Sequence, residues 1–171
     1  MLDNGGERLL NVGDKVFYPM HGAGVISGIE ENEVNGVTKS YYVLHMPMGS
    51  LKVMLPVDHM DKIGLRDIIP KEKVEEIRQV LADCPDRMQG SWNKRFHANL
   101  NRMKSGDILD VAAVARNLTL QDRKRRISSG ERRLMDLSRQ ILVSELTFAC
   151  ESTPEEMMAW VDEILSKHSV T

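Results

Sequence analysis

The spacing of apolar residues changes near Pro70, and this change divides the chain into two parts that must fold differently. Before it, short runs rich in Val, Ile, Tyr and Phe are separated by Gly, Asn, Pro and Ser, a pattern typical of strands. After it, apolar residues recur every three or four positions, which indicates amphipathic helices. We therefore predict an α+β chain, with a β unit over residues 1–66 followed by an all-α unit over residues 67–171.

Four strands are predicted in the first part, over residues 15–19, 24–34, 37–46 and 51–57. The pair Asn35-Gly36 favours a tight hairpin, because both central residues of such a turn need positive φ. A meander of four or five short strands is best closed into a small, twisted barrel. The glycines at 22, 24 and 28 do not fit the dinucleotide-binding spacing, so we attribute them to backbone geometry.

Five helices are predicted in the second part, with a linker over residues 83–91 after the first of them. Capping signals mark three of the helix starts: Ser91, the pair Ser128 and Glu131, and Thr153 followed by Pro154. Glu156 is expected to complete the cap at Thr153. Trp160 falls on the apolar face of the last helix, so we assign it to the core.

Charge is distributed unevenly, although the net charge is only −2. Residues 92–139 carry 12 Lys and Arg against 5 Asp and Glu, whereas the segments before and after them are acidic. Such a basic block can attract a polyanion. Nucleic acid is therefore a candidate partner for the middle of the chain.

Catalytic signatures are missing from the sequence. The five histidines have no metal-ligand spacing, no Walker lysine follows a glycine loop, and no nucleophile motif stands out. We expect a binding protein without enzymatic activity, cofactor, metal or small-molecule ligand. Cys84 and Cys150 are expected to be reduced core thiols. The short apolar runs and the lack of a signal pattern favour a cytoplasmic protein with no membrane partner.

Trp92 can be interpreted in two ways. It stands in the first turn of a predicted helix near Lys94, Arg95 and His97, and an aromatic ring among cations suits a wedge at a DNA base step. Its helical spacing with Phe96 and the apolar residues that follow favours a core position instead.

Other basic residues are equally open to two interpretations. The run 123–126 ends a predicted helix, where cations are usually solvated and complement the helix dipole. Arg132 and Arg133 begin the next helix, where positive charge is unfavourable without an anion. A partner phosphate or Asp136 could supply that anion.

Several segments together resemble the CarD and CdnL family of bacterial transcription regulators. They are NVGDKVFYPMHGAGVI, SLKVMLPV, IGLRDII, SWNKRFHANLNRMKSGD and SSGERRLMDLSRQILVSEL, and they cover roughly residues 11–168 in the family's order. The first part alone also resembles the polymerase-interacting module of transcription-repair coupling factors. The resemblance implies a Tudor-like or SH3-like barrel that binds the β subunit of RNA polymerase, and a helical domain that contacts promoter DNA.

Site residues follow from the resemblance. It implies that Trp92 is a minor-groove wedge at the upstream edge of the transcription bubble, which would stabilise the open complex, with Lys94, His97 and Arg132 near the DNA backbone. We add Arg95 to the DNA-binding set because it stands beside Trp92 in the same helical segment. For polymerase binding, the resemblance implies Asn32 and the strand that consists of Ser50, Leu51, Lys52, Val53 and Met54. Some relatives carry arginine at the positions of Asn32 and Met54. A nucleoid association through RNA polymerase would follow. The alternative is a polymerase adaptor that makes no direct DNA contact.

Overall fold

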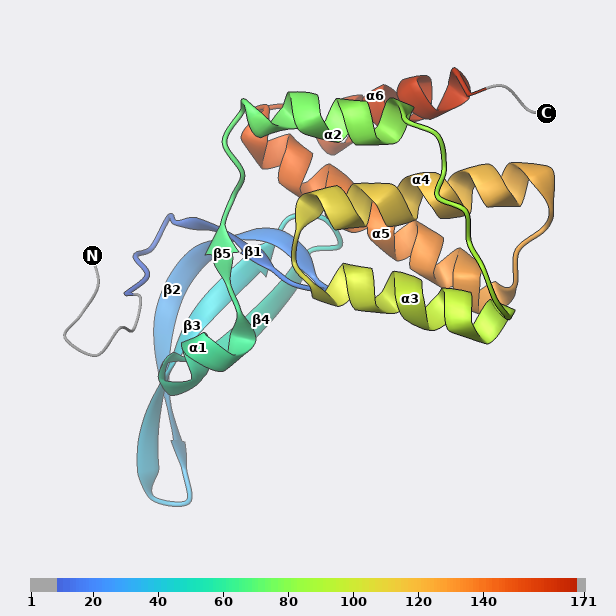
Figure 1. Ribbon diagram of the computed structural model, residues 1–171. Helices are drawn as coiled ribbons and strands as arrows, with labels where there is room; N and C mark the ends of the chain where they lie inside the picture. The colour runs from blue at the N-terminus through green and yellow to red at the C-terminus, as the bar shows by residue number, and fades with distance from the viewer. Residues whose placement is uncertain (1–8, 169–171) are drawn as a thin grey trace. The chain divides into compact units, whose positions relative to one another are not determined.

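The computed structural model describes residues 9–168 and divides the chain into two compact units between Ile68 and Ile69. The first unit consists mainly of strands and the second of helices (Figure 1). The predicted α+β class, with a small Tudor-like β domain followed by five helices, is confirmed. The boundary expected after residue 66 falls inside a two-residue strand, Arg66–Asp67, that belongs to the sheet of the first unit.

Five antiparallel strands form the sheet of the first unit in the order β4-β3-β2-β1-β5. Their bounds are β1 Lys15–Tyr18, β2 Gly22–Val34, β3 Val37–Met46, β4 Leu51–Pro56 and β5 Arg66–Asp67. The four predicted strands are confirmed, with small shifts at their ends. Two short helices that the sequence did not predict, η1 (Val57–His59) and α1 (Met60–Ile63), connect β4 to β5.

The predicted hairpin between β2 and β3 is confirmed. Asn35 and Gly36 have φ angles of 54° and 77°, as a turn with two left-handed residues requires. Because β4 pairs only with residues 41–46 of β3, the far part of the hairpin continues without a third strand. Figure 1 shows this part, residues 31–40, as a two-stranded arm that extends beyond the sheet; we call it the hairpin arm.

Gly24 has a steric role in the sheet. A Cβ atom at this position would lie 2.8 Å from the carbonyl oxygen of His45 and 2.9 Å from Cδ1 of Leu44, so only glycine lets β2 approach β3 this closely. Three residues later the register shifts between Ile26 and Gly28, which marks a bulge at Ser27. Bulges increase local strand twist, and this one precedes the hairpin arm.

The β unit has its own hydrophobic core. It consists of buried side chains from every long strand and from the segment before β1, namely Leu10, Val16, Ile26, Tyr42, Leu44, Met46 and Leu55. The backbone N–H of Leu10 donates to the hydroxyl oxygen of Tyr42 at 3.3 Å, which ties that segment to the sheet.

The second unit contains α2 (Lys73–Ala82), α3 (Trp92–Lys104), α4 (Ile108–Lys124), α5 (Ser129–Ala149) and α6 (Pro154–Ser166). The predicted caps at Ser91, Ser128 and Thr153 are confirmed, including the reciprocal capping box of Ser128 and Glu131. One detail is wrong. The carboxylate of Glu156 accepts from the hydroxyl of Ser152 rather than completing the cap at Thr153.

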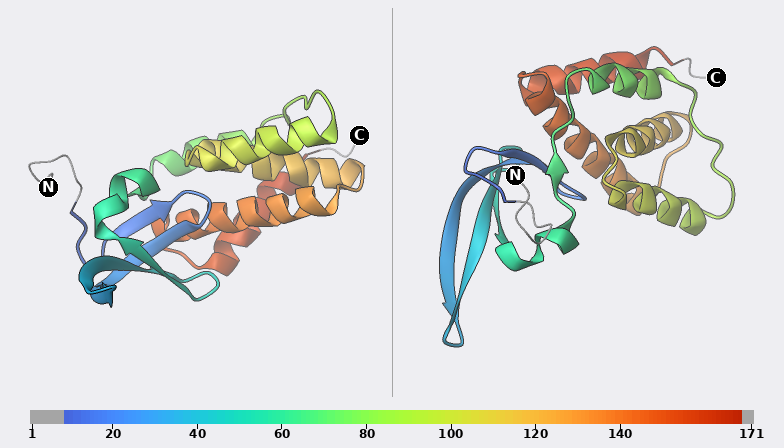
Figure 2. Two further views of the ribbon diagram at one scale, coloured as in Figure 1. Left: turned by 90° about the horizontal axis from the view of Figure 1, so that it is seen from below. Right: turned by 60° about the vertical axis from the view of Figure 1, so that its left-hand side comes forward.

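Helix α4 is the centre of the second unit. Every residue from Val111 to Leu120 is buried, and α4 contacts the other four helices. Figure 2 shows it nearly end-on among its neighbours. A helix that is buried all round acts as the core element on which the others pack. Within residues 9–168, no helix has the length and apolar character that a membrane span needs.

Two predictions of burial need correction. Cys84 is exposed because it lies in the linker after α2 rather than in the core, whereas Cys150 is partly buried. Burial raises the pKa of the Cys150 thiol. Trp160 is only partly buried, because it lies at the rim of a shallow hollow between α2 and the end of α6.

Candidate nucleic-acid and protein interfaces

The side chain of Trp92 is 56% exposed, so the core position favoured by its spacing is wrong. The apolar stripe that the spacing predicts along α3 is nevertheless present. Along it, burial increases from Trp92 through the partly buried Phe96 and Leu100 to Met103, which is 1% exposed. A helical side chain leans toward the N-terminus of its helix. At the first residue of α3, that lean carries the ring past the end of the helix, where no neighbouring turn can cover it.

Lys94 and His97 lie on the outer side of α3. Both are exposed, and three residues of helix separate their directions by only about 60°. They therefore form a small basic face on the side of α3 opposite the stripe that begins at Trp92. The edge of the His97 ring contacts Phe96, with centroids 5.8 Å apart.

Arg95 points differently from its two neighbours. It is partly buried, and its Nη1 donates to the carbonyl oxygen of Gly90 at 2.9 Å. Its Nε is buried and has no hydrogen-bond partner among residues 9–168. The sequence grouped Arg95 with Lys94 and His97, but the structure turns its guanidinium toward the interior of the helical unit.

Arg132 is held by an acidic partner that the sequence did not predict. Its Nη2 lies 2.9 Å from Oδ1 of Asp122, near the end of α4. The expected alternatives were a phosphate and Asp136. Because both side chains of the pair are partly exposed, the pair leaves Arg132 able to exchange its partner for another anion.

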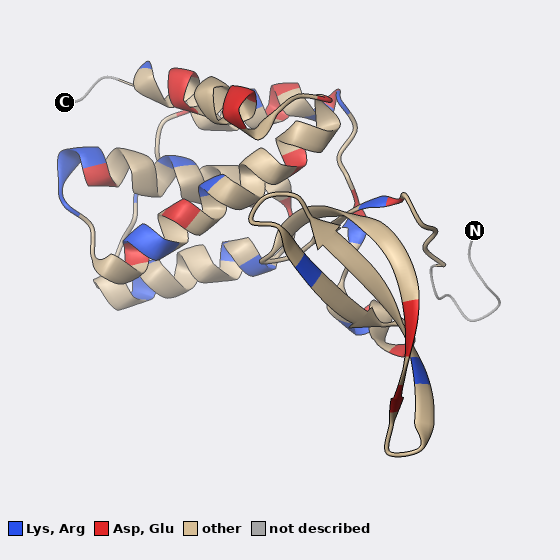
Figure 3. Ribbon diagram, turned by 180° about the vertical axis from the view of Figure 1, so that it is seen from behind, with Lys and Arg blue, Asp and Glu red and all other residues tan. Residues whose placement is uncertain are grey.

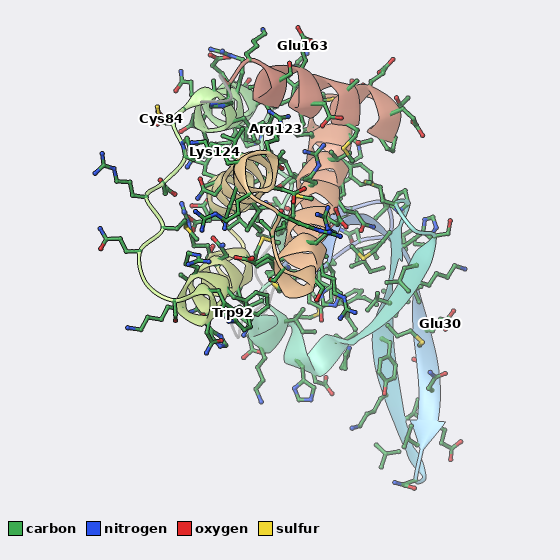
Figure 4. All side chains as sticks on the ribbon, turned by 90° about the vertical axis from the view of Figure 1, so that its right-hand side faces the viewer. Glu30, Cys84, Trp92, Arg123, Lys124 and Glu163 are labelled. Atoms are coloured by element: carbon green, nitrogen blue, oxygen red, sulfur yellow. The ribbon has the colours of Figure 1, made fainter. Side chains whose placement is uncertain are left out.

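The end of α4 and the loop after it bring further cations to the same end of the helical unit. Figure 3 shows Lys and Arg concentrated on this segment, and Figure 4 views the end directly, with Trp92, Arg123 and Lys124 labelled. All four cations of the run 123–126 are exposed, and Arg123 also donates to the carbonyl oxygen of Leu165 at 2.6 Å. The sequence left this run unassigned because nothing in it indicated that α4 ends beside the start of α3.

Asp86 fixes the linker that leads to Trp92. Its Oδ2 lies 2.7 Å from Nη1 of Arg102 on α3 and accepts from Nδ2 of Asn117 on α4 at 3.0 Å. These partners hold the pKa of Asp86 below its ordinary value, the hydrogen bond from Asn117 being the largest cause and that from Arg102 the next. The guanidinium of Arg116, 4% exposed, lies 3.2 Å from the same oxygen. No motif in the sequence indicates this network, because its members lie on three separate segments.

On the β unit, the predicted polymerase-binding strand is an edge of the sheet. β4 pairs with β3 alone, so one side of its backbone has no neighbouring strand in residues 9–168. Leu51 and Met54 are exposed on it, at 51% and 40%. An exposed apolar edge can accept a strand from another protein. Ser50 immediately precedes β4 in a left-handed conformation, with φ 51°.

Asn32 is not part of this edge. It pairs with Lys39 in the hairpin arm, on a strand that β3 separates from β4. Its neighbours Glu31 and Glu33 are exposed, as are Val34 and Val37 at the tip. The structure therefore keeps residues 50–54 together and places Asn32 at a second location.

An open sheet edge on one unit and an exposed tryptophan among cations on the other are features of a two-domain interaction protein. No group of three or more His, Cys, Asp or Glu side chains that could hold a metal occurs among residues 9–168. Each of the two units matches the model of a known protein family. Residues 76–162 match the CarD C-terminal domain, residues 10–69 match the CarD-like/TRCF RID domain, and the chain belongs to the CarD family.

Curated relatives agree with this family. The chain is 28% identical over 138 residues to a Bacillus subtilis (strain 168) protein named "Putative transcription factor YdeB", a match that covers 81% of this chain and 90% of the relative. It is also 41% identical over 54 residues to the transcription-repair-coupling factor of the same organism, covering 32% of this chain and 4% of that protein.

A similar factor of Staphylococcus aureus (strain MRSA252) is 26% identical over 155 residues. That match covers 91% of this chain and only 12% of the relative. The chain thus spans most of the first relative and a small part of the coupling factors.

Proposed function

We propose that this chain is a transcription regulator that binds the β subunit of RNA polymerase through β4 and stabilises the open promoter complex through Trp92. The single observation that carries the DNA part is the exposure of the Trp92 ring at the end of α3. A large aromatic side chain in solvent costs hydrophobic free energy, so its position calls for a binding role. Lys94 and the cations after α4 lie at the same end of the helical unit and carry charge that suits phosphates.

The physical basis of the effect is a difference in affinity between two DNA states. Inserting a ring between stacked base pairs costs a few kcal/mol. At the upstream edge of a melted bubble, that stacking is already lost, so the ring binds the open state better than the closed one. A ligand shifts an equilibrium only by such a difference, and about 1.4 kcal/mol of it changes the ratio tenfold.

Docking on polymerase supplies the local concentration that a weak DNA contact needs. The family relation to the RID domain of coupling factors and the open edge of β4 support this role. Since the DNA contacts are mainly with phosphates and the minor groove, we expect little sequence preference.

The test is the lifetime of the open complex formed by RNA polymerase on a promoter with and without the chain. We expect Trp92→Ala to shorten that lifetime by about tenfold relative to the unchanged chain, as the loss of one stacking contact implies. Trp92→Phe should retain part of the effect. Polymerase binding, measured in parallel, should stay the same. An unaltered lifetime with Trp92→Ala would refute the wedge.

The second candidate is a polymerase adaptor without DNA contact. The ion pair between Arg132 and Asp122 favours it, because that arginine already has an anion. The adaptor predicts that charge reversal at Lys94, Arg95 and Arg132 leaves promoter effects intact. The wedge model predicts that Lys94→Glu weakens DNA binding, whereas Lys104→Glu at the other end of α3 does not.

Docking through β4 is tested separately. Glutamates at the exposed apolar positions Leu51 and Met54 should abolish polymerase binding, because each would bring an unpaired charge into the strand contact. Val12→Glu, at an exposed apolar residue outside the strands, is the matched control. Equal losses in both variants would mean that β4 has no special role.

A further inference from the structure

A cavity of about 380 Å³ lies within the helical unit, beside the first turns of α3. The linker, α3, the end of α4, the loop after it and the first turn of α5 all contribute to its wall. This volume falls within the range of roughly 300–1,000 Å³ that is typical of small-molecule pockets. The proposed function draws on the cations of its wall, Lys124, Arg125 and Arg126, but assigns no role to the hollow itself.

Positive charge dominates the wall of the cavity. Lys124, Arg125 and Arg126 line it, and none of them belongs to an ion pair identified within residues 9–168. The two acidic residues of the wall are already engaged. Asp86 is paired with arginines of α3 and α4, and Glu131 accepts from Ser128 through Oε2. A concave surface with unpaired cations concentrates anions.

Two buried polar atoms in the wall lack partners. Glu131 is 3% exposed, and its Oε1 has no hydrogen-bond partner among the residues that the structure describes; the same holds for Nε of Arg95. Buried polar groups in folded proteins are nearly always satisfied. A ligand that carries both an N–H donor and an anionic oxygen could satisfy both after small side-chain movements.

The remaining wall is apolar. Met88 of the linker is partly buried, and Leu120 of α4 is 7% exposed. A flat ring system can pack on such side chains while its polar edge reaches the carboxylate. A nucleotide combines these three features, because it has an anionic phosphate, a planar base and an N–H donor on that base.

We infer that this cavity binds a nucleotide. Its phosphate lies among Arg95, Arg125 and Arg126, its base packs on Met88 and Leu120, and an amino or imino group of the base donates to Glu131. The nucleotide is either free in solution or part of an unpaired promoter strand, and only the second source depends on the proposed function. From the sequence we expected nucleic acid as a partner of this part of the chain, but no small-molecule ligand and no pocket.

Titration calorimetry with the full chain tests this inference. We expect AMP, GMP or CMP to bind about tenfold more tightly than inorganic phosphate or the corresponding nucleoside, because phosphate and base each contribute contacts. Met88→Trp, which fills the cavity from the linker, should abolish binding. Equal affinity for phosphate and every nucleotide would overturn the inference, since it would mean attraction to surface charge alone.

A matched pair of variants locates the site. The double substitution of Arg125 and Arg126 by alanine removes two exposed cations of the wall and should weaken nucleotide binding by about tenfold. Arg133→Ala removes an exposed cation that does not line the cavity, and it should have no effect. Comparable losses in both would contradict a defined pocket.

Competition identifies the source of the nucleotide. If a single-stranded decathymidylate displaces the bound mononucleotide, the pocket is a site for an unpaired strand. If the mononucleotide stays bound in the presence of the decathymidylate, the pocket is a site for free nucleotide. Failure of every mononucleotide to bind overturns the inference. The open-complex assay of Trp92→Ala is independent of this result, so failure of the pocket and failure of the wedge are distinguishable.

Discussion

Arg132, in the first turn of α5, lies 2.9 Å from Asp122, near the end of α4, and this pair neutralises a cation expected to face DNA. We predict that Asp122→Asn increases affinity for forked DNA up to about fivefold at low salt, because a partly exposed ion pair is worth about 0–1 kcal/mol. Fluorescence anisotropy at two salt concentrations measures this. Adding Arg132→Ala should remove the gain; a gain that persists would show that Arg132 is not involved.

Trp92 should contribute little to the stability of its own domain. With 56% of the side chain exposed, Trp92→Ala is expected to change the free energy of unfolding by less than about 0.5 kcal/mol. Met103→Ala, on the same stripe but 1% exposed, should cost about 2–5 kcal/mol. Urea unfolding followed by circular dichroism compares the two. A large loss in Trp92→Ala would mean that the ring packs against the helices.

Asp86 should make stability depend on pH at acidic values. Its pKa is lowered in the folded state, so its contribution is fully present above the ordinary aspartate value of about 3.9 and is lost as pH falls through the lowered pKa. The difference in unfolding free energy between the unchanged chain and Asp86→Asn should therefore be larger at pH 6 than at pH 2. Asp136→Asn, at an exposed position of α5, removes a carboxylate outside this network and serves as the control for the substitution itself.

Gly24 and Gly28 provide a matched test of the sheet. Gly24→Ala places a Cβ atom 2.8 Å from a backbone oxygen and should destabilise the β unit by about 1–3 kcal/mol. Gly28→Ala meets no atom within 4 Å and should be close to neutral. Thermal unfolding of the two variants measures the difference. Similar melting temperatures would mean that β2 and β3 can separate at Gly24 without cost.

Local features of the fold could be predicted because each depends on residues close together in the chain. The turn at Asn35 and Gly36 needs only two left-handed residues. The cap of α5 needs only Ser128 and Glu131, which exchange hydrogen bonds within one turn. Apolar residues recur about every second position in strands and about every 3.6 positions in helices, and this difference separates the β unit from the helical one.

Features that join distant segments could not be predicted in this way. The position of β4 at the sheet edge depends on the order in which strands pair, which no single strand encodes. The partner of Arg132 is ten residues away on another helix. For Trp92, the period correctly gave the direction of the side chain, but its exposure depends on how far the neighbouring helices reach.

The linker before α3 is a place where an amino-acid substitution can act at a distance from the proposed DNA contacts. Asp86, six positions before the indole in the chain, ties this linker to α3 and α4 at once. A substitution at that carboxylate would leave every proposed DNA-contacting side chain unchanged and still release the linker that leads to the ring. Loss of promoter activity could thus arise from a residue that never touches the promoter.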